Sequence, residues 1–150
     1  MVKPLVIRRT IRLNAPPSTV WNALIDPKLT RKYMFGTEAV SDWKPGHSLL
    51  WKGVWEGKEK IFVKGNVILN EPQRILSFTV FDPNGDIPDI PSNYTTVTYE
   101  LVPDDEGTML LVTQGDYAKV AEGEKRYKES GDGWDTTLIK LKELVEGIPE

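Results

Sequence analysis

The chain has a single histidine, His47, and no cysteine. Histidine titrates near neutral pH without help from its surroundings, so His47 is the first candidate for general acid or base catalysis. It follows Lys44-Pro45-Gly46 in a turn, however, where a histidine is usually solvated. The lack of cysteine excludes thiolate nucleophiles, iron–sulfur clusters and cysteine-based zinc sites, and a single histidine excludes a multi-histidine metal centre.

Carboxylates could still bind Ca²⁺ or Mg²⁺, and three of them lie in the segment DPNGDIPDIPSN (82–93): Asp82, Asp86 and Asp89. Their spacing does not match an EF-hand loop, and the three prolines of the segment favour a stiff, solvated loop. We therefore predict neither a metal site nor a bound cofactor.

The same segment is too long for a tight turn, and it contains two isoleucines, Ile87 and Ile90. Long loops of this kind often close over a binding site. Two readings stay open: a lid over an apolar cavity, or a surface loop with two isolated apolar side chains.

Two polar side chains fall on the apolar faces of predicted strands, Tyr99 in 94–102 and Gln114 in 108–115. A buried hydroxyl or amide needs a hydrogen-bond partner. A polar group of a ligand, a buried water, or a hydrogen bond between the two would each satisfy them. Both are candidate ligand contacts.

On the neighbouring strands, large aromatic side chains occupy alternate positions that are expected to face inward, toward the core. Trp51 and Trp55 flank Gly53 in the strand predicted at 48–56, and Phe78 lies in the strand predicted at 75–81. Rings spaced around a glycine can border a cavity, although they can equally fill a core. The inward parity also includes Val63, Val67 and Leu69 of the next strand.

Composition indicates one soluble domain. The 150 residues have 39% hydrophobic and 27% charged side chains, a net charge of −3 and a pI near 5.3, so attraction to nucleic acid is not expected. The N-terminus lacks a signal-peptide pattern, and no stretch of about 20 apolar residues occurs. We expect a cytoplasmic protein without a membrane partner.

Sequence motifs of common enzymes are missing from the chain. No Gly-x-Ser-x-Gly, P-loop or dinucleotide fingerprint occurs.

The order of elements follows from periodicity and turn chemistry. Apolar and polar side chains alternate over residues 5–13, which predicts a half-buried strand; Arg9 is the one charged residue on its apolar face. Asn14 is expected to cap a first short helix that ends near Asp26, and Asp26-Pro27 to start a second that runs to Tyr33. Period-two strands follow at 48–56, 59–70, 75–81, 94–102 and 108–115. A C-terminal amphipathic helix is expected from about Lys119, with a break near Gly131 as the alternative.

These elements carry a set of ordered motifs: APPSTVWNALIDP (15–27), DWKPG (42–46), KGNVILNEPQRILSF (64–78), TVTYEL (96–101) and GWDTTLIKLKELVEG (133–147). In this order they resemble the START-like superfamily, and within it the heat-shock-protein-90 ATPase activator homologue-like family. The resemblance implies an α+β helix-grip fold, in which a curved antiparallel sheet wraps around a long C-terminal helix and encloses a cavity. It also implies that the second short helix and the C-terminal helix line that cavity, through Tyr33, Phe35, Trp134 and Leu138.

The family pattern has a second glycine where this chain has His47. Family members described as chaperone activators carry a further chaperone-binding domain, for which 150 residues filled by one START-like domain leave no room. The family name therefore does not by itself predict the activity.

We predict a non-catalytic protein that holds a small hydrophobic molecule between the sheet and the C-terminal helix. The candidate ligand-binding residues are Tyr33, Phe35, Trp51, Trp55, Phe78, Tyr99, Gln114, Trp134 and Leu138. Two other classes stay open. One is a polyketide cyclase or aromatase-like enzyme that uses Tyr99, Gln114 or His47, and the other is a chaperone- or stress-related interaction module. The chain is expected to be a monomer or a homodimer.

Overall fold

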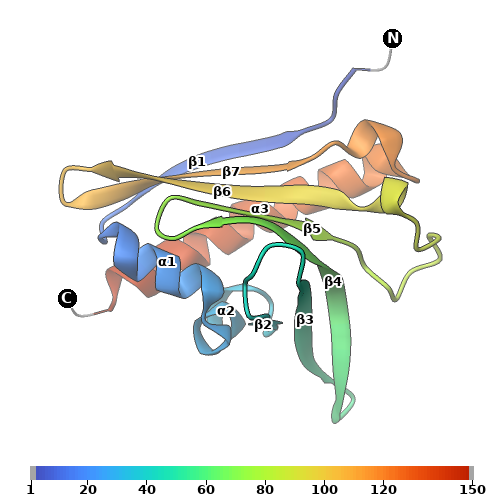
Figure 1. Cartoon of the computed structure of the whole chain (residues 1–150), viewed down its shortest axis with the longest axis horizontal. Helices are drawn as coiled ribbons and strands as arrows, with labels where there is room; N and C mark the ends of the chain where they lie inside the picture. Colours follow the sequence, from blue (N-terminus) through green and yellow to red (C-terminus); the bar gives the residue numbers. More distant parts are fainter. Residues whose placement is uncertain (1–2, 149–150) are drawn as a thin grey trace.

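The computed structural model describes residues 3–148. Its seven strands form one antiparallel sheet in the order β1-β7-β6-β5-β4-β3-β2. The elements follow one another as β1 (Ile7–Leu13), α1 (Pro17–Ile25), α2 (Pro27–Tyr33), β2 (Glu38–Val40), β3 (Ser48–Trp55), β4 (Lys58–Glu71), β5 (Ile75–Val80), η1 (Pro91–Asn93), β6 (Thr95–Asp104), β7 (Gly107–Gly115), η2 (Tyr117–Lys119) and α3 (Gly123–Glu146). Figure 1 shows α3 running along the sheet, with α1 and α2 at one end. The predicted helix-grip α+β fold is confirmed.

The two short helices begin differently from each other. Asp26 caps α2 as predicted, because its side chain accepts a hydrogen bond from the backbone N–H of Lys28 at 2.9 Å. The expected Asn14 cap of α1 is wrong. Pro16 occupies the cap position without a side-chain hydrogen bond, while the backbone N–H of Asn14 donates to the Glu146 carboxylate at 2.8 Å. Asn14 therefore ties β1 to the end of α3.

The long helix α3 begins four residues later than predicted and is continuous, so the alternative of a break near Gly131 is wrong. Gly131 faces β1, where an added Cβ would lie 3.2 Å from Nη2 of Arg9. Arg9, the one charged residue on the apolar face of β1, donates from Nε to the Asp135 carboxylate of α3 at 2.7 Å. The glycine thus makes room for an arginine that links β1 to the helix. None of the helices in residues 3–148 is long and apolar enough to cross a membrane.

Two irregularities in β4 change which side chains face the core. The pairing shifts after Trp51↔Val63 to Lys52↔Ile61, which leaves Phe62 without a partner residue. A second shift lies between Val67 and Leu69. An extra residue in a strand reverses the parity beyond it, and Leu69, predicted to face inward, is 37% exposed. Period-two reading of the sequence cannot detect such bulges.

The β3–β4 hairpin projects from the body of the protein, beyond the cover of α3 (Figure 1). At its end, Val54 is 73% exposed and Trp55 57% exposed. The inward position expected for Trp55 is therefore wrong, although its parity matches that of the buried Trp51. Strand β2, which pairs with the other edge of β3, was not predicted because three residues are too few to show a period.

Candidate functional site

A cleft lies between the sheet and α3. It consists of two adjoining cavities of about 440 Å³ and 530 Å³ that share six lining residues and are therefore continuous. The shared residues are Val63, Val80, Asp82, Gln114, Glu129 and Ser130. We call the larger cavity the apolar compartment and the smaller one the polar compartment.

Five aromatic side chains line the apolar compartment. Phe35 follows α2, Trp51 and Phe62 come from the β3–β4 pair, Phe78 from β5, and Trp134 from α3. The rings of Trp51 and Phe78 are 6.1 Å apart and tilted, a geometry that aromatic pairs favour. Phe35 is the most exposed of these five residues, at 67%.

The sequence predictions divide into two groups. The apolar compartment brings together five of the nine predicted ligand-binding residues, namely Phe35, Trp51, Phe78, Gln114 and Trp134. The other four lie outside both compartments. Tyr33, Tyr99 and Leu138 are buried in the core, and Trp55 is exposed on the hairpin.

The bulge residue Phe62 lines the apolar compartment, but it was missed because its parity is opposite to that of Val63. Met34, Thr37 and Thr137 were also missed. No sequence signal separates these residues from ordinary core or surface positions. They become visible only when α2, the sheet and α3 are placed together.

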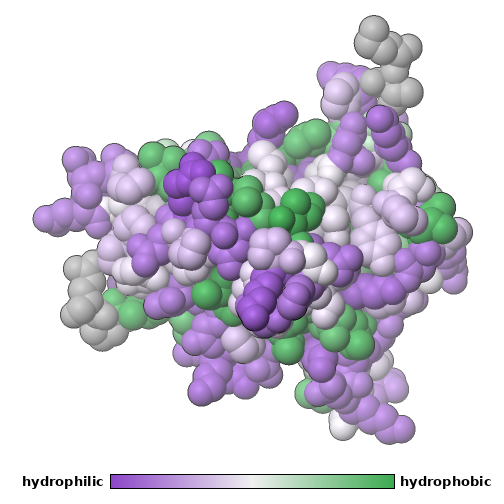
Figure 2. Space-filling view, in the orientation of Figure 1, coloured by the Kyte–Doolittle hydropathy of each residue, from purple (hydrophilic) through white to green (hydrophobic). Residues whose placement is uncertain are grey.

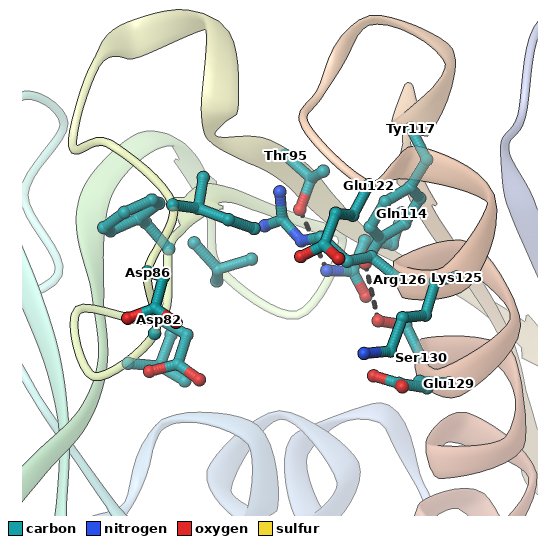
Figure 3. A pocket seen from close by; sticks show the side chains of 15 residues that line it. Asp82, Asp86, Thr95, Gln114, Tyr117, Glu122, Lys125, Arg126, Glu129 and Ser130 are labelled. Atoms are coloured by element: carbon teal, nitrogen blue, oxygen red, sulfur yellow. Dashed lines mark hydrogen bonds between the residues drawn. The ribbon is translucent and has the colours of Figure 1, made fainter.

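A chain of hydrogen bonds crosses the junction of the two compartments. The Trp134 indole N–H donates to Oε1 of Gln114 at 2.7 Å, and Nε2 of Gln114 donates to Oγ1 of Thr95 at 3.0 Å. Nearby, the Tyr117 hydroxyl donates to Oγ of Ser130 at 2.7 Å (Figure 3). Gln114 is thus satisfied by Thr95 and Trp134 rather than by Tyr99. Its amide is held in one orientation at the centre of the cleft.

Tyr99 lies behind the wall of the apolar compartment. Its ring contacts Phe78 at 5.9 Å and Trp134 at 5.8 Å between centroids. The hydroxyl oxygen is buried and has no hydrogen-bond partner within residues 3–148. Burial raises the pKa of the Tyr99 hydroxyl far above its ordinary value, so the group stays protonated.

We expect Tyr99→Phe to leave the free energy of unfolding unchanged or to raise it by up to about 1 kcal/mol, since it removes an unsatisfied buried hydroxyl. Tyr33→Phe is the matched control, because the Tyr33 hydroxyl donates to the Ala23 carbonyl at 2.6 Å. That variant should lose about 1 kcal/mol. Urea unfolding of both measures the difference, and an equal loss in the two variants would contradict the assignment.

Charged side chains surround the polar compartment (Figure 3). Asp82 and Asp86 come from the 82–93 loop, whereas Glu122, Lys125, Arg126 and Glu129 come from α3 and the residue before it. The Arg126 guanidinium lies 5.9 Å from the Tyr117 ring centroid and donates to the Asn93 carbonyl at 3.4 Å. Arg126 therefore links the end of this loop to the helix.

The 82–93 loop covers the polar compartment with only one of its two isoleucines. Ile87 lines the compartment, whereas Ile90 lies outside it and is 47% exposed. The Asp89 carboxylate fastens the loop by accepting hydrogen bonds from Nζ of Lys64 and from the Tyr94 hydroxyl. The ion pair with Lys64 holds the pKa of Asp89 below its usual range.

Asp89→Asn is expected to accelerate amide hydrogen exchange within the 82–93 loop without unfolding the protein. Because the pKa of Asp89 is lowered in the folded state, the ion pair persists through neutral pH and is lost only as the pH falls through that lowered pKa. Protection factors of the wild type should fall in that acidic range, and those of Asp89→Asn should not. Asp86→Asn, in the same loop, is the control and should exchange like the wild type.

His47 does not contribute to either compartment. Its Nδ1 lies 2.6 Å from the Asp42 carboxylate in an exposed turn. The hydrogen bond from the Lys44 backbone N–H lowers the pKa of Asp42, and the contact with His47 lowers it further. The structure therefore separates His47 from the cleft. Within residues 3–148, no three His, Asp or Glu side chains are grouped to hold a metal ion.

The seven-stranded antiparallel sheet, the long C-terminal helix laid along it and the cleft between them define a helix-grip domain of the START-like class. The chain belongs to the family described as "Activator of Hsp90 ATPase homolog 1-like protein", whose model matches residues 14–146.

Solved structures agree with this assignment. The solution structure of ChR145 from Cytophaga hutchinsonii is 38% identical over 97% of this chain and 96% of its own, with a TM-score of 0.78. The Aha1 dimer from Colwellia psychrerythraea is 15% identical over 95% and 96% of the two chains, with a TM-score of 0.71. DynU16, from the dynemicin biosynthetic locus, is 18% identical over 97% of this chain and 48% of its own, with a TM-score of 0.73. The last two show the fold alone. No curated protein matches the chain.

Proposed function

We propose that the protein binds a small amphipathic molecule whose apolar body occupies the apolar compartment and whose polar group reaches the junction at Gln114 and Ser130. The observation that carries this proposal is the aromatic cavity of about 530 Å³ that the side chains leave open between sheet and helix. Ligand sites are typically concave, 300–1,000 Å³ in volume and mostly apolar, with a few polar groups that orient the ligand.

The chemistry of the junction favours binding over catalysis. Burial raises the pKa of the Tyr117 hydroxyl, which therefore remains protonated at neutral pH and can donate hydrogen bonds. A general base would need a pKa near the working pH, and His47, the residue most suited to that task, is outside the cleft. The fixed Gln114 amide and the Ser130 hydroxyl are instead suited to orienting a polar group of a ligand.

Two measurements test the proposal. Native mass spectrometry of the purified protein, compared with its denatured mass, should reveal an additional mass that denaturation releases. Titration with Nile red, a neutral apolar dye with one carbonyl group, should give saturable one-to-one binding with a blue-shifted emission. A protein without additional mass that also fails to bind the dye saturably would overturn the proposal.

A further inference from the structure

Asn84-Gly85 is the one place in the chain where a glycine follows an asparagine, and the other five asparagines precede larger residues. An asparagine in this position can react with its own backbone, because the nitrogen of the next residue can attack the side-chain amide. Glycine favours this reaction most, since without a Cβ the backbone can bring that nitrogen close to Cγ. The pair lies in the 82–93 loop, and Gly85 lines the polar compartment.

Both reacting groups are accessible to water. Asn84 and Gly85 are exposed, and an added Cβ at Gly85 would meet no atom within 4 Å. Within residues 3–148, the Gly85 N–H donates to no other backbone group. The loop lies at the end of the sheet remote from α1, where the surface in Figure 2 is mainly hydrophilic. The attacking nitrogen is therefore not held in a hydrogen bond that the reaction must first break.

The Asn84 side chain ties the loop to the sheet. Its Nδ2 donates to the Ile61 carbonyl of β4 at 2.9 Å and to Oδ1 of Asp82 at 3.2 Å. In the part of the chain that the structure describes, the bond to Ile61 is the only hydrogen bond from residues 82–88 to a residue outside the loop. The ion pair of Asp89 holds the second half of the loop separately. One amide group thus fastens the first half.

We propose that Asn84 deamidates spontaneously to aspartate and isoaspartate, and that this change releases the first half of the 82–93 loop from β4. The Gly85 nitrogen attacks Cγ of Asn84 and gives up its proton to water, while Nδ2 takes up a proton and leaves as ammonia. The product is a five-membered cyclic imide. Water then opens either carbonyl of the ring, which gives aspartate or isoaspartate. Water is the only co-reactant, and the proposed ligand takes no part.

The carboxylate that forms at position 84 cannot replace the amide. It has no N–H to donate to the Ile61 carbonyl, so two acceptors face each other. It also lies beside the Asp82 carboxylate, and like charges so close together repel. The 82–93 segment already contains three aspartates and no Lys or Arg, so no cation within it offsets the new charge. Loss of the bond and repulsion both move the loop away from β4 and widen the polar compartment.

Ageing of the native protein at mildly alkaline pH, followed by peptide mapping with fragment sequencing, tests the reaction. Residue 84 should gain about 1 Da, the difference between an amide and a carboxyl group, while the other five asparagines stay unchanged. Gly85→Ala should slow the gain at least about tenfold, because a Cβ hinders the approach of the nitrogen. Asn84→Gln should abolish it.

The urea-unfolded chain, aged in parallel, provides the reference rate. The native protein should react more slowly than this reference, since two hydrogen bonds hold the leaving amide. Equal rates in the wild type and Gly85→Ala would overturn the proposed reaction. Absence of any mass gain in the native protein, over a period in which the unfolded chain reacts completely, would overturn it as well.

Asn84→Asp tests the release of the loop directly. Backbone NMR relaxation should give order parameters for Gly85, Asp86 and Ile87 that are lower than in the wild type by at least about 0.2. Asn22→Asp makes the same change at an exposed position of α1 and should leave these values unchanged. Thermal unfolding checks that both variants are folded.

Unchanged order parameters in Asn84→Asp would overturn the release, and so would an equal fall in Asn22→Asp. Nile red binding to freshly purified protein is measured separately. Failure of either step therefore leaves the proposed function standing, and failure of the dye to bind leaves the deamidation standing.

Discussion

Gly133→Phe is expected to reduce Nile red affinity at least about tenfold, or by about 1.4 kcal/mol, while the protein remains folded. Gly133 lies in α3 on the wall of the apolar compartment, and an added Cβ would meet no atom within 4 Å. A ring built on that Cβ therefore enters the space that the proposed ligand needs. The substitution should not weaken the helix, because glycine is among the poorest residues in a helix interior, by about 0.5 kcal/mol relative to phenylalanine.

The matched control is Thr136→Phe, which adds the same ring to an exposed position of α3 outside both compartments. Dye titration and thermal unfolding of the two variants separate occlusion from a change in stability. We expect Gly133→Phe to melt at or slightly above the wild-type temperature and Thr136→Phe to bind the dye normally. Unchanged affinity in Gly133→Phe would place the dye elsewhere on the protein.

Gln114→Leu is expected to lower the free energy of unfolding by about 2 kcal/mol, which corresponds to a fall in melting temperature of about 4–8 °C for a chain of this size. Leucine keeps the apolar bulk, but it removes the acceptor of the Trp134 indole N–H and the donor to Thr95. Both partner groups are buried, so the loss leaves their polar atoms without these hydrogen bonds.

A double-mutant cycle with Trp134→Phe isolates the contribution of this hydrogen bond. In the Trp134→Phe background the indole N–H is already absent, so Gln114→Leu should cost about 1 kcal/mol less than it does in the wild type. Additive effects of the two substitutions would contradict the assigned bond. Gln114→Leu should also lower dye affinity, because the proposed site uses the amide to orient the polar group of the ligand.

The best-predicted parts of the site are those that depend on unbroken strand pairing. The inward faces of β6 and β7 follow from strict alternation, and Val97, Tyr99, Leu110, Val112 and Gln114 are all buried. Here the side-chain period of two is maintained along the paired strands, so local pattern and tertiary position agree.

The errors occur where tertiary surroundings or a bulge overrode the local pattern. Trp55 has the correct parity, yet it is 57% exposed at the end of the projecting hairpin. Phe62 has the wrong parity, yet a bulge places it in the cleft. Tyr33 ends the predicted second helix, but it is buried in the core and lies outside both compartments, and its hydroxyl donates to the Ala23 carbonyl.

The amino-acid sequence by itself determines the order of elements, the buried faces of the long strands and the amphipathic C-terminal helix, since each depends on periodicity among near neighbours. Only the tertiary structure decides that Gln114 bonds Thr95 and Trp134, that Tyr99 is left unpaired behind the cleft, and that Nζ of Lys140 lies over the Phe35 ring. These features join segments that lie 19 to more than 100 residues apart, as Phe35 and Lys140 do, and no local pattern specifies how such segments meet.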